Sequence, residues 1–464
     1  MIRFFNTLSG KVETFTPITP DEAKLYTCGP TVYDYAHIGN FRAYVFEDLL
    51  KRFFVFLGFK VTHVMNITDV DDKTIKGAKA EGKTLDEYTR KYIDAFFEDI
   101  DLLNISRADF YPRATEHIQE MAALVKGLQE KGHAYEKEGS IYFSISKFPE
   151  YGALSKINLA ELKPGKRVEA DEYEKESAQD FALWKQKKEG EPFWETEIGA
   201  GRPGWHIECS AMSMKYLGQT FDIHCGGVDN IFPHHENEIA QSEAYTGKKF
   251  VRYWLHLHHL IVDGEKMSKS KGNQYTLRDL LEKNIDPLDL RFLLLSTHYR
   301  RLLNFTFEAL TQAHLSRQRI QDFVYELGHR TFKDGENGEI SKLVEETRKK
   351  FIEGLSNDLN ISLSLSALFE LIRKANILIT QDKAGKKDAQ KLASLLSSLD
   401  RILAILPRME EEELAPEVMK KIEEREKARR LKRFDVADRI REELLKKGII
   451  LEDTPEGVRW KIKK

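Results

Sequence analysis

The sequence predicts an α/β protein whose main domain contains a doubly wound parallel sheet. Residues 24–68 have the pattern strand, loop, helix, strand, with Gly58 ending the helix. Two parallel strands joined through a helix are typical of such sheets, which bind ligands beyond the carboxyl ends of their strands. Here those ends hold Cys28 and Thr68. From residue 289 onward the chain consists mainly of amphipathic runs, which predict a helical bundle attached to the sheet domain.

The individual elements follow from the spacing of apolar residues and from the breakers between them. KLYTCG and FKVTHVMNIT are the predicted strands, and FRAYVFEDLLKRFFVFLG is the predicted helix, apolar on nearly every face. Residues 70–112 are expected to be helical, and residues 113–203, a helix followed by a hairpin, are expected to be an insertion. The bundle helices are predicted over 313–330, 340–355, 362–380 and 386–405.

Composition and charge exclude several classes of protein. The 464 residues suffice for two or three domains, and the net charge of -3 gives no global attraction to polyanions, so any nucleic-acid surface must be local. The three cysteines are too few for a disulfide framework and are expected to be free thiols in a reducing compartment. Neither a signal-peptide pattern nor a membrane-length apolar run is present, so we expect a cytoplasmic protein without membrane contact.

Residues 204–241 contain three side chains that can bind a metal ion. Cys209 lies in an amphipathic run, and the spacing of His234 and Glu238 places both on one face of a helix that begins after Pro233. Zinc accepts thiolate, imidazole and carboxylate ligands, but this segment lacks a fourth ligand. The alternative is a surface polar pair beside a buried thiol, since no C-x-x-C motif is present.

Two distant loops have the composition of phosphate-binding segments. His37, Gly39 and Asn40 precede a helix, where free N–H groups and the helix dipole attract phosphate and glycine lets a base approach the backbone. EKMSKSKGN, residues 265–273, is a cationic loop that can fold over a triphosphate. Taken alone, each loop is equally typical of an ordinary solvated surface loop that binds no phosphate.

Together the two loops resemble the signature motifs of class I aminoacyl-tRNA synthetases, HIGH and KMSKS. Four further segments resemble the cysteinyl-tRNA synthetase family: YTCGPTVYDYAHIGNFR, NITDVDDKTI, RPGWHIECSAM and FDIHCGGVDNIFPHHENEIAQ. The resemblance covers the catalytic half and continues more weakly to the C-terminus. It implies one zinc ion per chain, with Cys28 as the missing ligand beside Cys209, His234 and Glu238.

The resemblance also implies roles for the residues around the zinc ligands. The implied catalytic residues are His37, Lys266 and Lys269, which would stabilise the negative charge that develops on the phosphates of ATP. The resemblance implies that ATP binds together with Mg²⁺. The implied ATP-binding set contains these three residues together with Thr31, Gly39 and Asn40. The implied pocket for the substrate cysteine consists of Gly29, Thr31, Thr68, Trp205 and Asp229. Core packing of Trp205 and a turn position of Asp229 are the alternatives.

Two residues depart from the family pattern. Asn40 replaces the usual second His of HIGH, and it keeps a hydrogen-bond donor but carries no charge. Cys225 stands where glycine is commoner. It is interpreted as a packed thiol rather than as a competing ligand.

The resemblance divides the chain into five parts. Residues 1–112 and 204–288 are expected to form the two halves of a Rossmann-like catalytic domain, separated by a connective insertion over 113–203. The second half carries the zinc site and the KMSKS loop. Residues 289–408 are expected to be a tRNA-binding helical bundle, and 418–464 a small mixed α/β module that binds the anticodon.

The implied activity is ATP-dependent conversion of L-cysteine to cysteinyl-adenylate, followed by transfer to the 3′ end of tRNA(Cys). One alternative is a cysteine ligase acting on a small amine acceptor, which has no need for a basic anticodon module. A second alternative is a non-catalytic relative that binds tRNA or senses cysteine. A monomer is expected, since no exposed apolar dimer stripe is evident.

Overall fold

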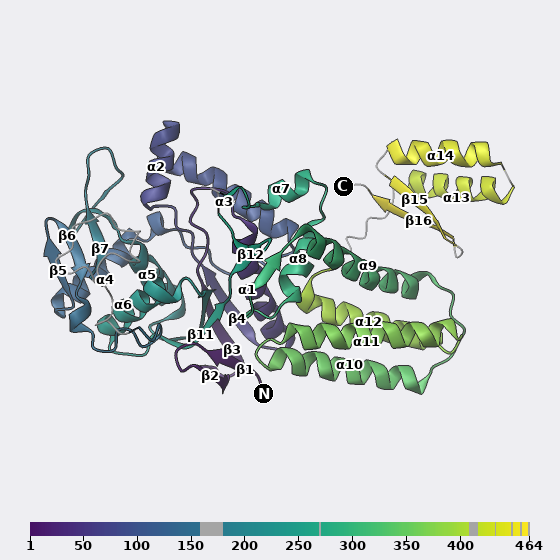
Figure 1. Ribbon diagram of the computed structural model, residues 1–464, viewed down its shortest axis with the longest axis horizontal. Helices are drawn as coiled ribbons and strands as arrows, with labels where there is room; N and C mark the ends of the chain where they lie inside the picture. The colour runs from purple at the N-terminus through teal and green to yellow at the C-terminus, as the bar shows by residue number, and fades with distance from the viewer. Residues whose placement is uncertain are drawn as a thin grey trace.

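The computed structural model describes residues 1–157, 180–268, 271–407, 416–431, 433–446, 449–454 and 457–462. Figure 1 shows the parallel sheet in the centre, with an inserted antiparallel sheet on one side and a bundle of long helices on the other. The last helices and strands of the chain form a small module beyond α9 (Phe307–His329). Within the residues so described, no helix is long and apolar enough to cross a membrane.

The central sheet has four parallel strands in the order β11-β10-β3-β4. These strands are β3 (Glu22–Thr27), β4 (Lys60–Met65), β10 (Phe221–Gly227) and β11 (Val251–Leu257). α1 (Ile38–Phe56) connects β3 to β4 and is buried on most faces because it packs against both the sheet and the bundle. The doubly wound parallel sheet predicted from the sequence is confirmed.

The chain leaves this sheet after β4 and returns at β10. The helices of this stretch are α2 (Asp72–Glu81), α3 (Leu85–Leu102), α4 (Ile118–Glu130) and α5 (Trp205–Leu217). An antiparallel sheet of order β5-β6-β7-β9-β8 forms the insertion, with strands Ala134–Lys137, Ser140–Phe143, Phe181–Gln186, Trp194–Thr196 and Gly199–Pro203 in chain order. Short 3₁₀ helices lie at Ala114–Glu116 and Ile145–Lys147. The predicted helix and hairpin of the insertion are both present.

A second crossover joins β10 to β11 and holds a π-turn at Ile231–His235 followed by α6 (Glu236–Thr246). Smaller sheets flank the main one: β1 and β2 pair at Arg3–Asn6 and Lys11–Thr14, and β12, β13 and β14 pair at Leu260–Val262, Glu265–Lys266 and Leu303–Phe305. α7 (Leu277–Glu282) and α8 (Pro287–Ser296) then lead into the bundle.

The bundle helices lie close to the ranges expected from the sequence. They are α9 (Phe307–His329), α10 (Gly338–Ser356), α11 (Ile361–Thr380) and α12 (Lys386–Leu403). Their apolar faces join those of α1 and the sheet in one continuous core. The bundle is therefore packed onto the sheet domain.

The small module at the end of the chain has a core of its own. It consists of α13 (Pro416–Arg430), α14 (Phe434–Lys446), β15 (Ile449–Thr454) and β16 (Gly457–Ile462). Ile422, Leu444, Ile449 and Leu451 are buried together there, in a cluster separate from the main core. The domain boundaries given above stay predictions.

Candidate active site and metal centre

A cavity of about 680 Å³ opens at the carboxyl ends of the parallel strands. The segments that follow β3, β4, β10 and β11 line it, as expected for a doubly wound sheet. The residues assigned from the sequence that line this cavity are Cys28, Gly29, Thr31, His37, Gly39, Asn40, Thr68, Trp205, Cys209, Asp229, His234 and Lys266. Glu238 lies behind the wall and is fully buried, and Lys269 falls outside the described residues.

The His37–Asn40 loop forms the start of α1. His37 is the N-cap: its Nδ1 accepts the Asn40 backbone N–H at 3.2 Å, and the Asn40 Oδ1 accepts the His37 backbone N–H at 3.1 Å. This reciprocal capping fixes the chain direction at the helix N-terminus, whose remaining N–H groups and dipole favour an anion in the cavity. The side chain of Asn40 is thereby committed to holding the loop.

The lysine-containing loop approaches the helix start from the other side. A Cβ on Gly39 would lie 2.9 Å from the Cε atom of Met267 and 3.1 Å from the His37 ring, so the loop reaches the helix start closely at this glycine. The Ser268 backbone N–H donates to Asn273 Oδ1 at 2.8 Å, and Asn273 Nδ2 donates to the Lys266 carbonyl at 3.3 Å. These bonds shape the described part of the loop and place Lys266 on the cavity wall.

The four predicted metal ligands come together in space. The candidate ligand atoms of Cys28, Cys209, His234 and Glu238 all lie within 4.8 Å of one another. Cys209 Sγ is 3.5 Å and Glu238 Oε1 is 3.1 Å from His234 Nε2. Ligands of a tetrahedral zinc ion are about 3.3–3.8 Å apart, as follows from bonds of about 2.0–2.3 Å. The quartet therefore has nearly the spacing that zinc requires.

The electrostatics of this quartet also fit a cation. Burial lowers the pKa of His234 to about 3 and raises the pKa of Glu238 to about 8, and the nearby His234 opposes the rise. A hydrogen bond with Cys209 and burial raise the pKa of Cys28. Glu238 Oε1 makes no hydrogen bond within the described chain although it is completely buried. A cation would stabilise the thiolates and the carboxylate that burial disfavours.

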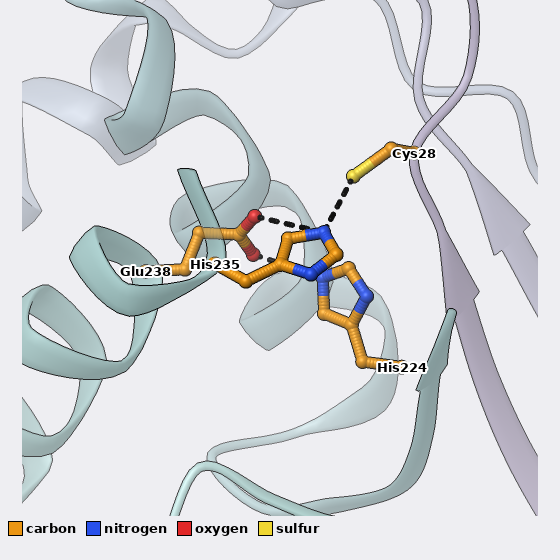
Figure 2. Close-up of side chains that lie close together, drawn as sticks. All are labelled: Cys28, His224, His235 and Glu238. Carbon is orange, nitrogen blue, oxygen red and sulfur yellow. Dashed lines mark hydrogen bonds and ion pairs between the residues drawn. The ribbon is translucent and has the colours of Figure 1, made fainter. Parts of the chain in front are cut away.

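A second quartet overlaps the first and was missed by the sequence reasoning. Figure 2 shows Cys28, His224, His235 and Glu238, whose ligand atoms also lie within 4.8 Å of one another. Cys28 Sγ is 3.4 Å from His235 Nε2, and Glu238 Oε2 is 2.9 Å from His224 Nε2. Among these four residues only Cys28 lines the cavity. Three members of the predicted quartet line it, so that quartet is the one open to a substrate.

Further imidazoles orient the predicted ligands from behind. His206 Nδ1 is hydrogen-bonded to His234 Nδ1 at 2.8 Å, which leaves His234 Nε2 facing the thiol of Cys209. His224 engages Oε2 of Glu238 and leaves Oε1 toward His234. Such outer hydrogen bonds fix the ring orientation of a ligand and its basicity. A sequence alone does not distinguish these histidines from core histidines, because their roles depend on which strand and helix faces meet.

The pocket beside the quartet is narrow. A Cβ on Gly29 would lie 1.7 Å from the Asn66 carbonyl oxygen, so this position admits glycine alone. Trp205 stacks on His234 with ring centroids 4.3 Å apart and is 38% exposed, which places it at the pocket rather than in the core. Asp229 is mostly exposed on the cavity wall, 3.9 Å from His259. The Thr68 hydroxyl is buried and donates to Glu208 Oε2 at 2.9 Å.

Glu47 is a cavity residue that the sequence reasoning did not identify. It lies on α1, lines the cavity and is 1% exposed, and Thr27 is the polar side chain beside its carboxyl group. Burial raises its pKa to about 8. Glu47 differs from a surface glutamate only because the cavity lies against the middle of α1. The sequence around Glu47 therefore contains no pattern that predicts its burial.

The raised pKa of Glu47 predicts a pH-dependent stability. The folded carboxyl keeps its proton up to about pH 8, whereas the unfolded one loses it near 4.5. The unfolded state therefore binds fewer protons between these values, and rising pH destabilises the fold by about 1.4 kcal/mol per pH unit. Glu47→Gln has no such carboxyl and does not lose stability in this way. The difference in free energy of unfolding between Glu47→Gln and the wild type is therefore expected to shift in favour of the variant by about 3 kcal/mol or more from about pH 5 to about pH 8. Urea unfolding of both proteins across this range measures the difference, and a pH-independent difference contradicts the buried neutral carboxyl.

Comparison with known proteins agrees with this geometry. Residues 14–315 match the family described as tRNA synthetases class I (C) catalytic domain, and residues 350–407 match the DALR domain. Cysteine–tRNA ligase of Chlamydia muridarum is 51% identical over 98% of both chains, and that of Koribacter versatilis is 47% identical over 100% of both. That of Brachyspira hyodysenteriae is 49% identical over 100% of this chain and 99% of its own.

Solved structures share the fold at much lower identity. Mycobacterium tuberculosis methionyl-tRNA synthetase in complex with methionyl-adenylate matches with a TM-score of 0.58 at 16% identity, over 83% of this chain and 90% of its own. LeuRS of Agrobacterium radiobacter K84, in a ternary complex, matches with a TM-score of 0.59 at 11% identity, over 84% of each chain. With relatives near half identity over almost the whole length, the chain belongs to the cysteine–tRNA ligase family of class I aminoacyl-tRNA synthetases.

Proposed function

We propose that the chain activates L-cysteine with ATP and transfers the cysteinyl group to the 3′ end of tRNA(Cys). One observation carries the proposal: Cys28, Cys209 and His234 line the same cavity as His37 and Lys266. Side chains suited to a thiol and side chains suited to phosphate thus share a volume within the usual range for ligand pockets. The relatives that match over the full length carry the name of this activity.

We propose further that Cys28, Cys209, His234 and Glu238 hold one zinc ion. Zinc bound there supplies a Lewis acid that prefers a thiolate ligand over a hydroxyl, since serine loses its proton at far greater cost than cysteine. Trp205, stacked on His234, limits the space beside the ligands to a small side chain. A pocket that distinguishes two amino acids by size alone gains only about 1–3 kcal/mol of selectivity per methylene. A competing amino acid that cannot form a specific bond to the site is rejected much more strongly.

The residues of the two loops would stabilise the charge of ATP during activation. The carboxylate of cysteine attacks the α-phosphorus, and the bond to pyrophosphate breaks. His37, Lys266 and Lys269 are assigned to the phosphates, with the N-terminus of α1 adding its dipole. Thr31, Gly39 and Asn40 shape the nucleotide site, and Mg²⁺ accompanies ATP. Gly29, Thr68 and Asp229 are assigned to the ammonium and carboxylate groups of the substrate cysteine. The thiol of the substrate then lies toward the metal ligands.

The parts of the chain outside the catalytic fold are assigned to tRNA. The bundle contains the DALR match, and the terminal module, which has a core of its own, is assigned to the anticodon. The small-acceptor alternative has no observation in its favour, because the relatives match beyond the catalytic half. The monomeric state and the cytoplasmic location stay predictions from the sequence.

Charging of bulk bacterial tRNA with labelled cysteine, with labelled serine in parallel, tests the proposed function. We expect ATP-dependent charging with cysteine alone. A chain lacking residues 416–464 is expected to lose more than about tenfold in charging, which corresponds to about 1.4 kcal/mol of tRNA binding, and to keep cysteine-dependent pyrophosphate exchange. Exchange without charging by the full chain would favour a small acceptor, and absence of both would contradict the proposed activity.

A further inference from the structure

A chain of hydrogen bonds crosses the wall of the cavity beside the metal ligands. The Gly29 backbone N–H donates to Asn66 Oδ1 at 3.0 Å, and Asn66 Nδ2 donates to Thr68 Oγ1 at 3.2 Å. Thr68 Oγ1 in turn donates to Glu208 Oε2 at 2.9 Å. Gly29, Asn66 and Thr68 line the cavity, whereas Glu208 lies behind them and is 1% exposed.

The backbone of this wall is already fixed without Glu208. The Thr68 N–H donates to the Pro30 carbonyl at 3.0 Å, and the Val32 N–H donates to the Thr68 carbonyl at 3.1 Å. These bonds pair the two strand extensions but leave the hydroxyl of Thr68 free to rotate. The bond to Glu208 is what selects one orientation of that hydroxyl among its rotamers.

The direction of the bonds defines what Thr68 can offer a ligand. A hydroxyl has a single proton and two lone pairs. The proton is given to Glu208 and one lone pair accepts from Asn66, so the remaining lone pair can only accept. Of the groups in cysteine next to such an acceptor, the ammonium is the donor that fits, and a carboxylate is repelled.

We propose that Glu208 is a positioning residue for substrate recognition, which holds the Thr68 hydroxyl as an acceptor for the ammonium group of cysteine. The inference rests on the proposed function and deepens it. Glu208 stands next to Cys209 on α5, so one turn of one helix supplies both a metal ligand and the anchor of the opposite wall. Glu208 Oε1 has no hydrogen-bond partner in the described part of the chain, so its contact with the polar wall runs through Oε2.

Two variants with opposite properties test the proposal in cysteine-dependent pyrophosphate exchange. Glu208→Gln keeps the length and an accepting oxygen but replaces the carboxyl group, and Glu208→Asp keeps the carboxyl group but is one methylene too short to reach Thr68. We expect Glu208→Asp to raise KM for cysteine about tenfold, the cost of one buried hydrogen bond, and Glu208→Gln to stay within about threefold. KM for ATP and zinc content are expected to be unchanged in both.

A double-mutant cycle and a control complete the experiment. If Glu208 acts through the hydroxyl, Thr68→Val/Glu208→Ala has the same KM for cysteine as Thr68→Val alone. Glu243→Ala removes a carboxylate that accepts the Phe250 N–H at 2.9 Å away from the cavity, and it is expected to leave KM unchanged. Additive effects, a larger loss in Glu208→Gln than in Glu208→Asp, or parallel loss of zinc overturn the inference. A wild type without cysteine-dependent exchange overturns the proposed function, and this inference with it.

Discussion

Cys209→Ser is expected to remove zinc from the protein and to abolish most cysteine activation. Cys209 Sγ lies 3.5 Å from His234 Nε2 and is 1% exposed, so a hydroxyl in its place leaves a poor ligand in a buried site. Loss of an outer hydrogen-bond partner of a ligand costs about 10–100-fold in metal affinity, and loss of a ligand costs more than about 100-fold. Metal analysis after dialysis and kcat/KM for cysteine in pyrophosphate exchange measure the two effects.

The overlapping quartets make this prediction more specific. Cys28 and Glu238 belong to both, whereas Cys209 belongs only to the predicted one and His235 only to the other. If the predicted quartet holds zinc, Cys209→Ser loses the metal and His235→Gln retains it. The opposite pattern would move the site to the quartet in Figure 2.

Cys225 provides the matched control for these variants. It is also a completely buried thiol, on β10, but it belongs to neither quartet. Cys225→Ala is expected to keep one zinc ion per chain, which separates loss of a ligand from loss of a buried thiol. Loss of zinc in this variant would contradict its interpretation as packing.

The parts of the site that were predictable from the sequence are those that local chemistry defines. The His37–Asn40 loop was expected to precede a helix, and both residues cap α1, which also gives Asn40 a use that the family pattern did not suggest. The i, i+4 spacing of His234 and Glu238 was expected to place them together, and their ligand atoms are 3.1 Å apart. In both cases the geometry depends on neighbours within one turn of helix.

The parts that escaped prediction depend on contacts between distant segments. His206, on α5, meets His234 from the turn before α6, and Glu208 meets Thr68 across a separation of 140 residues. Glu47, in the middle of α1, lines the cavity together with residues of the loop after β3. Nothing in the spacing of these residues distinguishes them from ordinary core or surface positions, because their partners are fixed by the tertiary packing alone.

Arg291→Met is expected to destabilise the protein more than any other single change at the junction of the sheet domain and the bundle. Arg291, on α8, is fully buried: its Nη2 donates to Asp48 Oδ2 at 2.6 Å, its Nη1 to the Leu103 carbonyl at 2.9 Å, and its Nε to the Leu403 carbonyl at 2.8 Å. Removing one partner of a buried ion pair costs about 3–5 kcal/mol. Among the described residues, Asp48 then keeps only its contacts with Arg52, whose side chain is partly exposed, and with the Ser106 N–H. Here two backbone carbonyls also lose their donor. Urea unfolding of the wild type and the variant measures the loss.

Arg52→Met is the matched control because Arg52 also donates to the same Asp48 oxygen, at 2.7 Å, and to two backbone carbonyls, those of Arg401 and Asn104. It differs from Arg291 in that its side chain is 19% exposed. Water can replace part of that contact, so we expect a loss of about 1 kcal/mol, well below that of Arg291→Met. Equal losses would mean that the charge of Asp48 alone decides stability. The unequal result carries a functional consequence, since Asp48 lies on α1, the helix whose first turn presents His37 to the cavity. Arg291 ties that helix to the end of α12, so loosening it is expected to reduce cysteine activation as well as tRNA charging.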